Sequence, residues 1–228
     1  AMEKDIVQGV VQLYVGRNVS LNLGKGDAIL SEQEQVKGEV FQPTERIKLY
    51  VVEGKNTTTG PKILASRTHP ELVKRLFEAA LTEVSDGVVE IRSIAREAGS
   101  RTKIAVWSND PDVDPVGACV GMNGARVNTI VNELRGEKID IINWSDNPGI
   151  LIENALSPAK VISVMADPDE KTASVIVPDY QLSLAIGKEG QNARLAARLT
   201  GYKIDIKSES QAIESGALTE NYMDLMEG

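Results

Sequence analysis

The chain has 228 residues, which allows one to three domains, and its 42% hydrophobic content is enough for packed cores. It has a formal net charge of -8, one Cys and one His. Because it contains no run of 18 apolar residues and no charged-then-apolar leader, we expect neither a membrane span nor a signal peptide. A single Cys excludes an internal disulfide and fits the reducing cytosol, so we expect a cytoplasmic protein. Since no membrane span is expected either, we predict no membrane contact.

The negative charge argues against nucleic acid only superficially, because it is unevenly distributed. Residues 1–67 have a net charge of +1 and residues 147–207 of 0, whereas residues 208–228 hold five acidic and no basic residues. A neutral module with local cations can still bind RNA, and we expect its affinity to depend only weakly on salt.

The first third of the chain alternates apolar and polar residues between Gly, Asn and Asp turns, which is typical of short strands. We predict strands at residues 4–15, 19–23, 28–30, 46–52 and 63–66, forming a small all-β, OB-type barrel. Such barrels bind bases through aromatic and cationic side chains. The candidates are Tyr14, Arg17, Phe41, Arg46, Lys48 and Tyr50. Alternatively, Tyr14 and Phe41 only pack in the barrel core or at its edge.

The next segment begins with a helix over residues 68–84, which Thr68 is expected to cap, with Pro70 in the first turn and Glu71 completing a capping box. The lone His69 has no second His to work with, so a catalytic role is not expected. Strands are predicted at residues 88–96 and 102–108.

The acidic stretch that follows does not match a calcium loop. That loop requires Gly at its sixth and Glu at its twelfth position, where this chain has Pro115 and Gly121. We therefore expect Asp114 to cap a short helix that starts at Pro115.

An internal repeat carries the functional argument. The chain contains 19 Gly, which is about the average glycine content of proteins. At this content about one or two G-x-x-G pairs are expected by chance, so the spacing alone is not informative. However, the pair Gly121 and Gly124 matches Gly187 and Gly190 at an offset of 66, and the Lys-Ile-Asp-Ile run that follows each pair matches at an offset of 65. Each copy is predicted as helix, strand, strand, helix, G-x-x-G, helix, strand.

The second copy starts with a helix at Asn147-Pro148. Strands at residues 161–166 and 172–177 follow, and Asp179 is expected to cap the short helix before the second loop. A helix and a strand at residues 203–207 complete the copy.

A G-x-x-G loop between two helices is the signature of a KH motif, which clamps the backbone of about four single-stranded nucleotides. The glycines allow close approach of an anion, and the next helix directs its N-terminal N–H groups toward it. The predicted RNA contacts are Gly121, Met122, Asn123, Gly124 and Arg126 in the first copy, and Gly187, Lys188, Glu189, Gly190, Gln191, Asn192, Arg194 and Arg198 in the second. Arg198 is alternatively structural or solvated.

The two loops are not expected to bind equally. The first has Met122 and Asn123 where the second has Lys188 and Glu189, so it lacks a cation and should bind RNA less tightly. In each copy an apolar groove is expected between the helix after the loop and the closing strand. Replacing Gly187 and Gly190 together by Asp is expected to abolish most binding and leave the fold intact.

Seven stretches together identify a known family. They are Leu64–Pro70, Gly99–Val106, Ser108–Pro111, Asp114–Gly121, Asn132–Ile142, Asn154–Val161 and, above all, Val177–Ser210. In these stretches the chain resembles the RNA-binding portion of the NusA family of bacterial transcription factors. The resemblance implies an S1 domain (an OB-fold) at residues 1–67 and type II KH domains at 68–146 and 147–207. The acidic composition of residues 208–228 predicts a solvated tail or one weak helix.

The resemblance also implies a function. It implies a monomeric, non-enzymatic factor without cofactor or metal, which holds single-stranded nascent RNA and modulates pausing, termination and antitermination by RNA polymerase. Other antitermination factors are further expected partners. The family's N-terminal polymerase-binding domain is expected to be absent from this chain.

Two other functions stay open at this point. An RNA-processing phosphorylase or nuclease can carry KH and S1 modules, but the sequence offers no metal-ligand spacing and no nucleophile–base pair. A protein-interaction scaffold with degenerate KH units is favoured slightly by the uncharged first loop and the acidic total.

Overall fold

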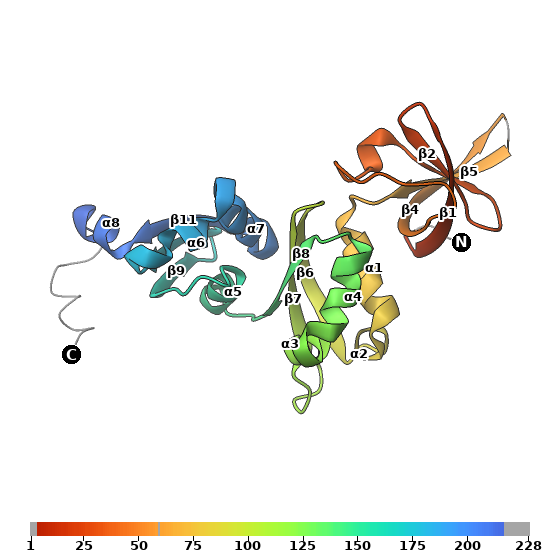
Figure 1. Cartoon of the computed structure of the whole chain (residues 1–228). Coiled ribbons are helices and arrows are strands. Elements are labelled where there is room, and N and C mark those ends of the chain that lie inside the picture. The colour runs from red at the N-terminus through yellow and green to blue at the C-terminus, as the bar shows by residue number, and fades with distance from the viewer. Residues whose placement is uncertain (1–3, 59, 217–228) are drawn as a thin grey trace. The chain divides into compact units, whose positions relative to one another are not determined.

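The computed structural model describes residues 4–58 and 60–216 of the chain (Figure 1). The chain divides into two compact units, which are described separately. The first comprises residues 1–91, 96–102 and 108–139, and the second comprises residues 92–95, 103–107 and 140–228. In the part that the structure describes, no helix has the length and apolar character needed to cross a membrane.

The N-terminal strands close into a barrel in the order β1-β2-β3-β5-β4, which confirms the predicted OB-type barrel (Figure 1). The strands are β1 (Ile6–Val15), β2 (Asn18–Asn22), β3 (Asp27–Leu30), β4 (Arg46–Thr57) and β5 (Gly60–Ser66). In β2 the apolar residues Val19 and Leu21 are fully buried and the flanking Asn residues are exposed, as expected for a period of two. β4 and β5 are longer than predicted.

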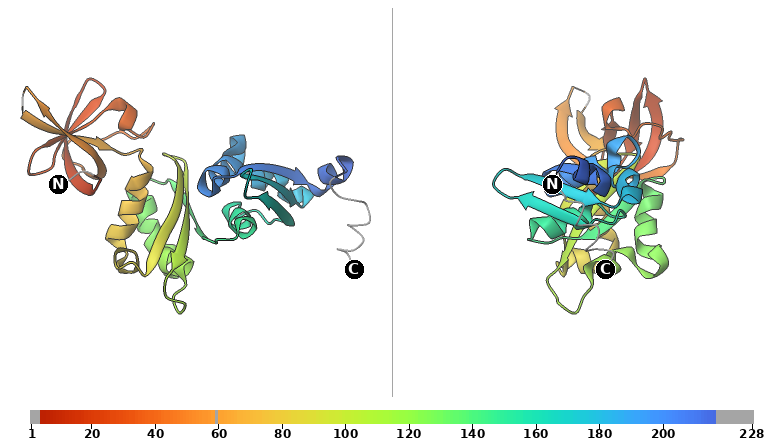
Figure 2. Two further views of the ribbon diagram at one scale, coloured as in Figure 1. Left: turned by 180° about the vertical axis from the view of Figure 1, so that it is seen from behind. Right: turned by 90° about the vertical axis from the view of Figure 1, so that its left-hand side faces the viewer.

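The second repeat has the predicted order of elements, and the first differs only in that two helices replace the single helix predicted over residues 68–84. The first has α1 (Pro70–Ala80), α2 (Thr82–Ser85), β6 (Val89–Glu97), β7 (Arg101–Ser108), α3 (Pro115–Val120), α4 (Ala125–Glu133) and β8 (Lys138–Asn143). The second has α5 (Pro148–Ala155), β9 (Ser163–Asp167), β10 (Thr172–Val177), α6 (Leu182–Ile186), α7 (Gln191–Thr200) and β11 (Lys203–Ser208). α1 and α4 lie side by side (Figure 2).

The strands of each repeat form a three-stranded sheet. Their orders are β6-β7-β8 and β11-β10-β9. In the second sheet β10 pairs parallel with β11 and antiparallel with β9. The chain therefore consists of an OB-type barrel followed by two type II KH folds.

The predicted cap of the first helix is wrong. α1 begins at Pro70, and its N-cap is His69, whose Nδ1 accepts a hydrogen bond of 3.1 Å from the amide of Glu71. The His69 ring stacks on Tyr50 with a centroid distance of 4.6 Å, which holds the imidazole in its capping position. The Thr68 hydroxyl instead contacts Ser66 and Glu34.

The predicted cap of the helix before the second loop is also wrong. Asp179 lies in a 3-10 turn (Asp179–Gln181), and its carboxylate accepts hydrogen bonds from the amide and the hydroxyl of Ser210. Ser210 belongs to α8 (Glu209–Glu214), which begins with a capping box at Ser208 and buries Ala212. The stretch predicted as a tail or one weak helix thus starts with an attached helix, and residues 217–228 lie outside the described residues.

Two further N-cap residues precede α3 and α5, and of these only Asp114 was predicted as a cap. Asn147 accepts hydrogen bonds from the amides of Gly149 and Ile150 at the start of α5. Asp114 is the N-cap residue of α3, although its carboxylate makes no capping hydrogen bond in the described structure.

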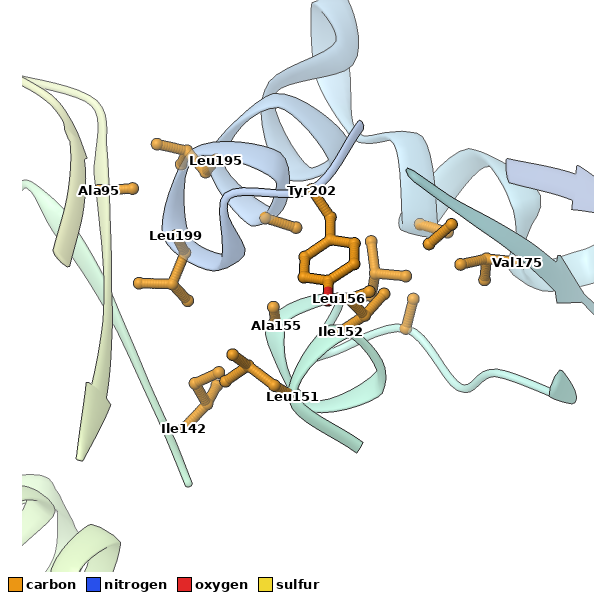
Figure 3. Packing of buried hydrophobic residues seen from close by; sticks show 14 of the residues in the cluster. Ala95, Ile142, Leu151, Ile152, Ala155, Leu156, Val175, Leu195, Leu199 and Tyr202 are labelled. Atoms are coloured by element: carbon orange, nitrogen blue, oxygen red, sulfur yellow. The ribbon is translucent and has the colours of Figure 1, made fainter. Parts of the chain in front are cut away.

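An apolar core in the second unit includes residues from strands of the first repeat (Figure 3). Ala95, Ala105 and Ile142 belong to the same buried cluster as Leu199 and Tyr202. Two polar contacts join the same elements. Ser93 Oγ donates to the Leu199 carbonyl at 2.6 Å, and the buried Lys103 Nζ donates to the Ser157 carbonyl at 2.7 Å. The two repeats are therefore joined by packing as well as by the chain.

A buried ionic cluster joins the barrel to α4 within the first unit. Arg67 Nη2 lies 2.6 Å from Glu39 Oε2, and Arg67 Nη1 lies 3.2 Å from Glu133 Oε1. Arg67 also donates to the carbonyls of Lys48 and Glu133, and Arg135 pairs with Glu45 at 2.7 Å. Since α4 starts directly after the first G-x-x-G loop, this cluster fixes the far end of the helix that the loop precedes.

Candidate nucleic-acid interface

The two G-x-x-G loops have the same backbone conformation. The first glycines have φ/ψ of 77/173° in Gly121 and 80/170° in Gly187, and the last glycines have 76/13° in Gly124 and 76/12° in Gly190. The residues before the last glycines also agree, with 55/28° in Asn123 and 56/26° in Glu189. Two segments with different side chains thus form the same loop.

The first glycine of each loop is required by a close approach as well as by its positive φ. A Cβ atom added to Gly187 would lie 2.7 Å from the amide nitrogen of Asn192, and one added to Gly121 would lie 2.9 Å from that of Arg126. At Gly190 the nearest atom would be Arg194 Nη1 at 3.8 Å. The expectation that Asp at Gly187 leaves the fold intact therefore conflicts with the packing beneath this loop.

The last glycine of each loop is the N-cap residue of the following helix, α4 or α7. Glycine has no side chain with which to cap, so the first-turn N–H groups of these helices can donate to a bound anion. The residue before it is in the left-handed region, which Asn tolerates better than Glu. This geometry suits a phosphate group and is built from the backbone in both loops.

The side chains beside the second loop have two roles. Lys188 is exposed in the loop and supplies a cation. Arg194 Nη1 donates to the Glu189 carbonyl at 3.0 Å, which stabilises the strained loop residue, and the Arg194 side chain stays exposed. Gln191 and Arg198 lie on α7, in its first and last turns.

Asn192, which was predicted to contact RNA, lies beneath the loop in the described structure. Asn192 is 4% exposed, and its Nδ2 donates to the carbonyls of Leu156 and Ala185. The residue at the same place in the first repeat, Arg126, donates to the Ala118 carbonyl at 3.0 Å. In both repeats the fifth residue after the first glycine ties the helix before the loop to the helix after it.

The first loop presents no cation of its own. Met122 is 85% exposed at its tip. Arg126 is exposed but pairs with Glu83 at 2.9 Å, and the pKa of Glu83 is lowered by a hydrogen bond to its own backbone and by Arg126. Cys119 is fully buried, and burial raises the pKa of its thiol to about 11.

Exposed apolar side chains lie on the helix before the second loop, whereas the apolar groove was predicted beside the helix after it. Leu184 and Ile186 of α6 are partly exposed, and Tyr180 before α6 is 77% exposed. β11 forms the edge of its sheet, so one side of its backbone is not paired with another strand. The period of α6 could have indicated this surface, because Ala185 faces the core between Leu184 and Ile186.

Two of the barrel candidates for base stacking are buried. Phe41 is 2% exposed in the barrel core, where the Arg135 guanidinium lies 4.6 Å from its ring centroid. Tyr50 is 5% exposed and stacks on His69. The alternative of core packing holds for Phe41.

The other barrel candidates remain accessible to different degrees. Tyr14 is partly exposed, and its hydroxyl accepts a hydrogen bond from the Phe41 amide. Arg17 is exposed and pairs with Glu32 at 3.1 Å, while Lys48 is only half-exposed. Arg46 lines a hollow of ≈ 700 Å³ together with side chains of β1 and β2.

Two models of KH domain families match the chain. The NusA-like first KH domain matches residues 67–144, and the NusA-like second KH domain matches residues 148–214. Together they cover well over half of the chain and both loops. The chain belongs to the NusA family.

Curated relatives carry the name "Transcription termination/antitermination protein NusA". The NusA of Halalkalibacterium halodurans is 58% identical over 218 residues, covering 96% of this chain and 57% of the relative. The NusA of Bacillus subtilis is 58% identical over 214 residues, covering 94% of this chain and 58% of the relative. The NusA of Thermus thermophilus is 47% identical over 203 residues, covering 89% and 52%. The chain thus spans somewhat over half the length of these NusA relatives.

Proposed function

We propose that this chain is a single-stranded RNA-binding module of a transcription factor. It holds nascent RNA and thereby modulates pausing, termination and antitermination by RNA polymerase. The observation that carries this proposal is the common backbone conformation of the two G-x-x-G loops, which is retained although their central residues differ. The names of the NusA relatives support the transcriptional role.

The loops act as phosphate clamps in this proposal. Backbone N–H groups at the starts of α4 and α7 donate to phosphate oxygens, and Lys188 adds a charge in the second loop. Bases lie against the apolar side of α6 and the free edge of β11, where Leu184 and Ile186 are partly exposed. On the barrel, considered by itself, the proposed RNA contacts are Tyr14, Arg17, Arg46 and Lys48.

The proposed partners follow from this role. They are RNA, RNA polymerase acting with the longer protein, and other antitermination factors, with the chain itself a monomer. No catalytic role is proposed, and the domain limits proposed are 1–67, 68–146, 147–207 and 208–228.

An anisotropy titration tests the proposal. A short unstructured RNA, its DNA analogue and the matched duplex are titrated at two salt concentrations. We expect preferential binding of the single-stranded RNA with a shallow salt slope, because few cations take part. Equal binding of the duplex, or no binding, contradicts the proposal.

A loop variant that keeps both glycines gives the sharper control. Lys188→Asp with Glu189→Asp replaces the cation of the loop by a second carboxylate without a new Cβ contact at Gly187, and Asp tolerates the left-handed conformation. Met122→Asp with Asn123→Asp is the matched change in the first loop. We expect the second-loop variant to lose more affinity than the first-loop variant.

One observation favours a scaffold as the second candidate. Arg126, the cation nearest to the first loop, is held by Glu83 and the Ala118 carbonyl. A protein scaffold predicts that the first-loop variant binds RNA as the wild type does, even at low salt.

A further inference from the structure

Both tryptophans of the chain lie in one cluster in the second unit. Trp107 belongs to β7, and Trp144 directly follows β8. Their ring centroids are 5.8 Å apart with an interplanar angle of 88°, which is an edge-to-face contact. The Arg92 guanidinium carbon lies 4.8 Å from the Trp144 centroid and 5.8 Å from the Trp107 centroid.

The two indoles differ in burial. Trp144 is half-buried against the core of the second unit, and its amide donates to the Val106 carbonyl at 2.8 Å. Trp107 is 39% exposed. Trp144 therefore anchors the cluster, whereas Trp107 keeps a large part of its ring in water, although aromatic rings normally gain stability from burial.

The chemistry of this surface suits a nucleobase. An exposed indole offers a flat π face, and base–aromatic stacking tolerates every base because each has such a face. The guanidinium of Arg92 lies over the same rings, where it adds a positive charge that favours a ligand carrying phosphate. An aromatic ring beside a cation is the combination that single-stranded nucleic acids bind.

We propose that Trp107, held in place by Trp144 and Arg92, is a stacking platform for one unpaired base of a bound single-stranded RNA. The proposal rests on the RNA-binding function proposed above and adds a contact outside both G-x-x-G loops. Stacking depends little on salt, whereas phosphate contacts weaken as salt rises. The loss caused by removing Trp107 should therefore be similar at low and high salt.

Single-tryptophan variants observe the contact directly. Trp144→Phe retains Trp107, and Trp107→Phe retains Trp144. RNA with an end label is titrated into each variant, and label anisotropy and tryptophan fluorescence are recorded in the same samples. We expect fluorescence quenching in Trp144→Phe that follows the anisotropy curve, and no quenching in Trp107→Phe. Binding to Trp144→Phe without a fluorescence change overturns the proposal.

Affinity provides a second measurement in case Trp144→Phe does not fold. Trp107→Ala should weaken RNA binding by about 5-fold to about 150-fold at both salt concentrations. Met165→Ala, which also truncates an exposed apolar side chain on a strand, should bind as the wild type does. Equal affinities of Trp107→Ala and Met165→Ala overturn the platform.

The outcomes separate this proposal from the proposed function. RNA binding that depends on Lys188 and Glu189 but not on Trp107 overturns the platform alone. A wild-type chain that binds no RNA by anisotropy overturns both.

Discussion

At the scale of single residues, Gly187 is required for two reasons that can be separated. Its φ of +80° lies in the region that favours glycine, and its Cα approaches the backbone of Asn192. Gly201 has a similar φ of +76°, but a Cβ atom added there would meet nothing within 4 Å. The two positions therefore form a matched pair.

Replacing each of these glycines by alanine should give different losses of stability. Gly201→Ala should lower the free energy of unfolding by about 1–2 kcal/mol, the cost of a left-handed residue with a side chain. Gly187→Ala should cost about 1–3 kcal/mol more, because the methyl group overpacks against backbone that cannot move aside easily. Urea unfolding monitored by circular dichroism measures both, and equal losses would contradict the close-approach argument.

The buried thiol of Cys119 makes stability depend on alkaline pH. The folded-state pKa of the thiol is raised to about 11. The contribution of the protonated thiol to folding stability is therefore fully present below the unfolded-state pKa and is lost as pH rises through the folded-state pKa. Unfolding midpoints should fall between about pH 8.5 and pH 11. In Cys119→Ala this part of the fall should disappear, and an unchanged alkaline profile would show that the thiol is accessible.

At the scale of elements, the short C-terminal helix α8 is attached through one carboxylate. Asp179 accepts from both the amide and the hydroxyl of Ser210, and these hydrogen bonds lower its pKa. Because the pKa is lowered in the folded state, the ionised Asp179 carboxylate stabilises the fold above its ordinary pKa. This stabilisation is lost as pH falls through the folded-state pKa.

Removing this carboxylate should therefore loosen α8. In Asp179→Ala, amide hydrogen exchange at residues 211–214 should become faster. Asp169→Ala, in the exposed turn between β9 and β10, is the control and should leave it unchanged. Equal exchange in both variants would mean that the capping box at Ser208 and the burial of Ala212 hold the helix without Asp179.

The order of elements could be predicted because it is encoded locally. Alternating residues indicate the barrel strands, and the internal repeat indicates the helices and strands of both KH folds. The predicted helix caps fail where a distant partner competes for the side chain. Asp179 bonds Ser210 instead of its own helix, and His69 caps α1 because Tyr50 holds its ring. Such long-range contacts leave no mark in a local sequence pattern.

The part of the candidate site that the backbone forms, the two G-x-x-G loops, could be predicted from the sequence. The glycine spacing and the repeat predict two loops, which the structure builds alike. Side-chain roles were less accessible, because burial depends on the whole fold. Asn192 lies beneath the loop, Phe41 fills the barrel core, and the Trp107 cluster combines residues from three segments.

At the scale of the whole molecule, Arg67 links the barrel to the KH helix α4 within the first unit. Its side chain is buried, as is that of Glu39, so truncation leaves a buried carboxylate without its partner. The half-buried pair of Arg75 and Glu78 offers a comparison, because water screens it.

Truncating the two arginines should have unequal effects. Arg67→Met should lower the free energy of unfolding by about 3–5 kcal/mol, whereas Arg75→Met should cost about 1 kcal/mol or less. Urea unfolding of both variants measures the difference. A small loss for Arg67→Met would show that Arg135 takes over its contacts with Glu39.

The central claim is that both G-x-x-G loops hold RNA phosphates through their backbone. The most direct measurement is an NMR titration of the ¹⁵N-labelled chain with a short unstructured RNA, in which the amide signals of Gly121, Gly124, Gly187 and Gly190 are followed. We predict that all four signals shift and saturate together, with larger changes in the second loop, where Lys188 adds its charge. Saturating RNA binding without shifts at these amides would contradict the account.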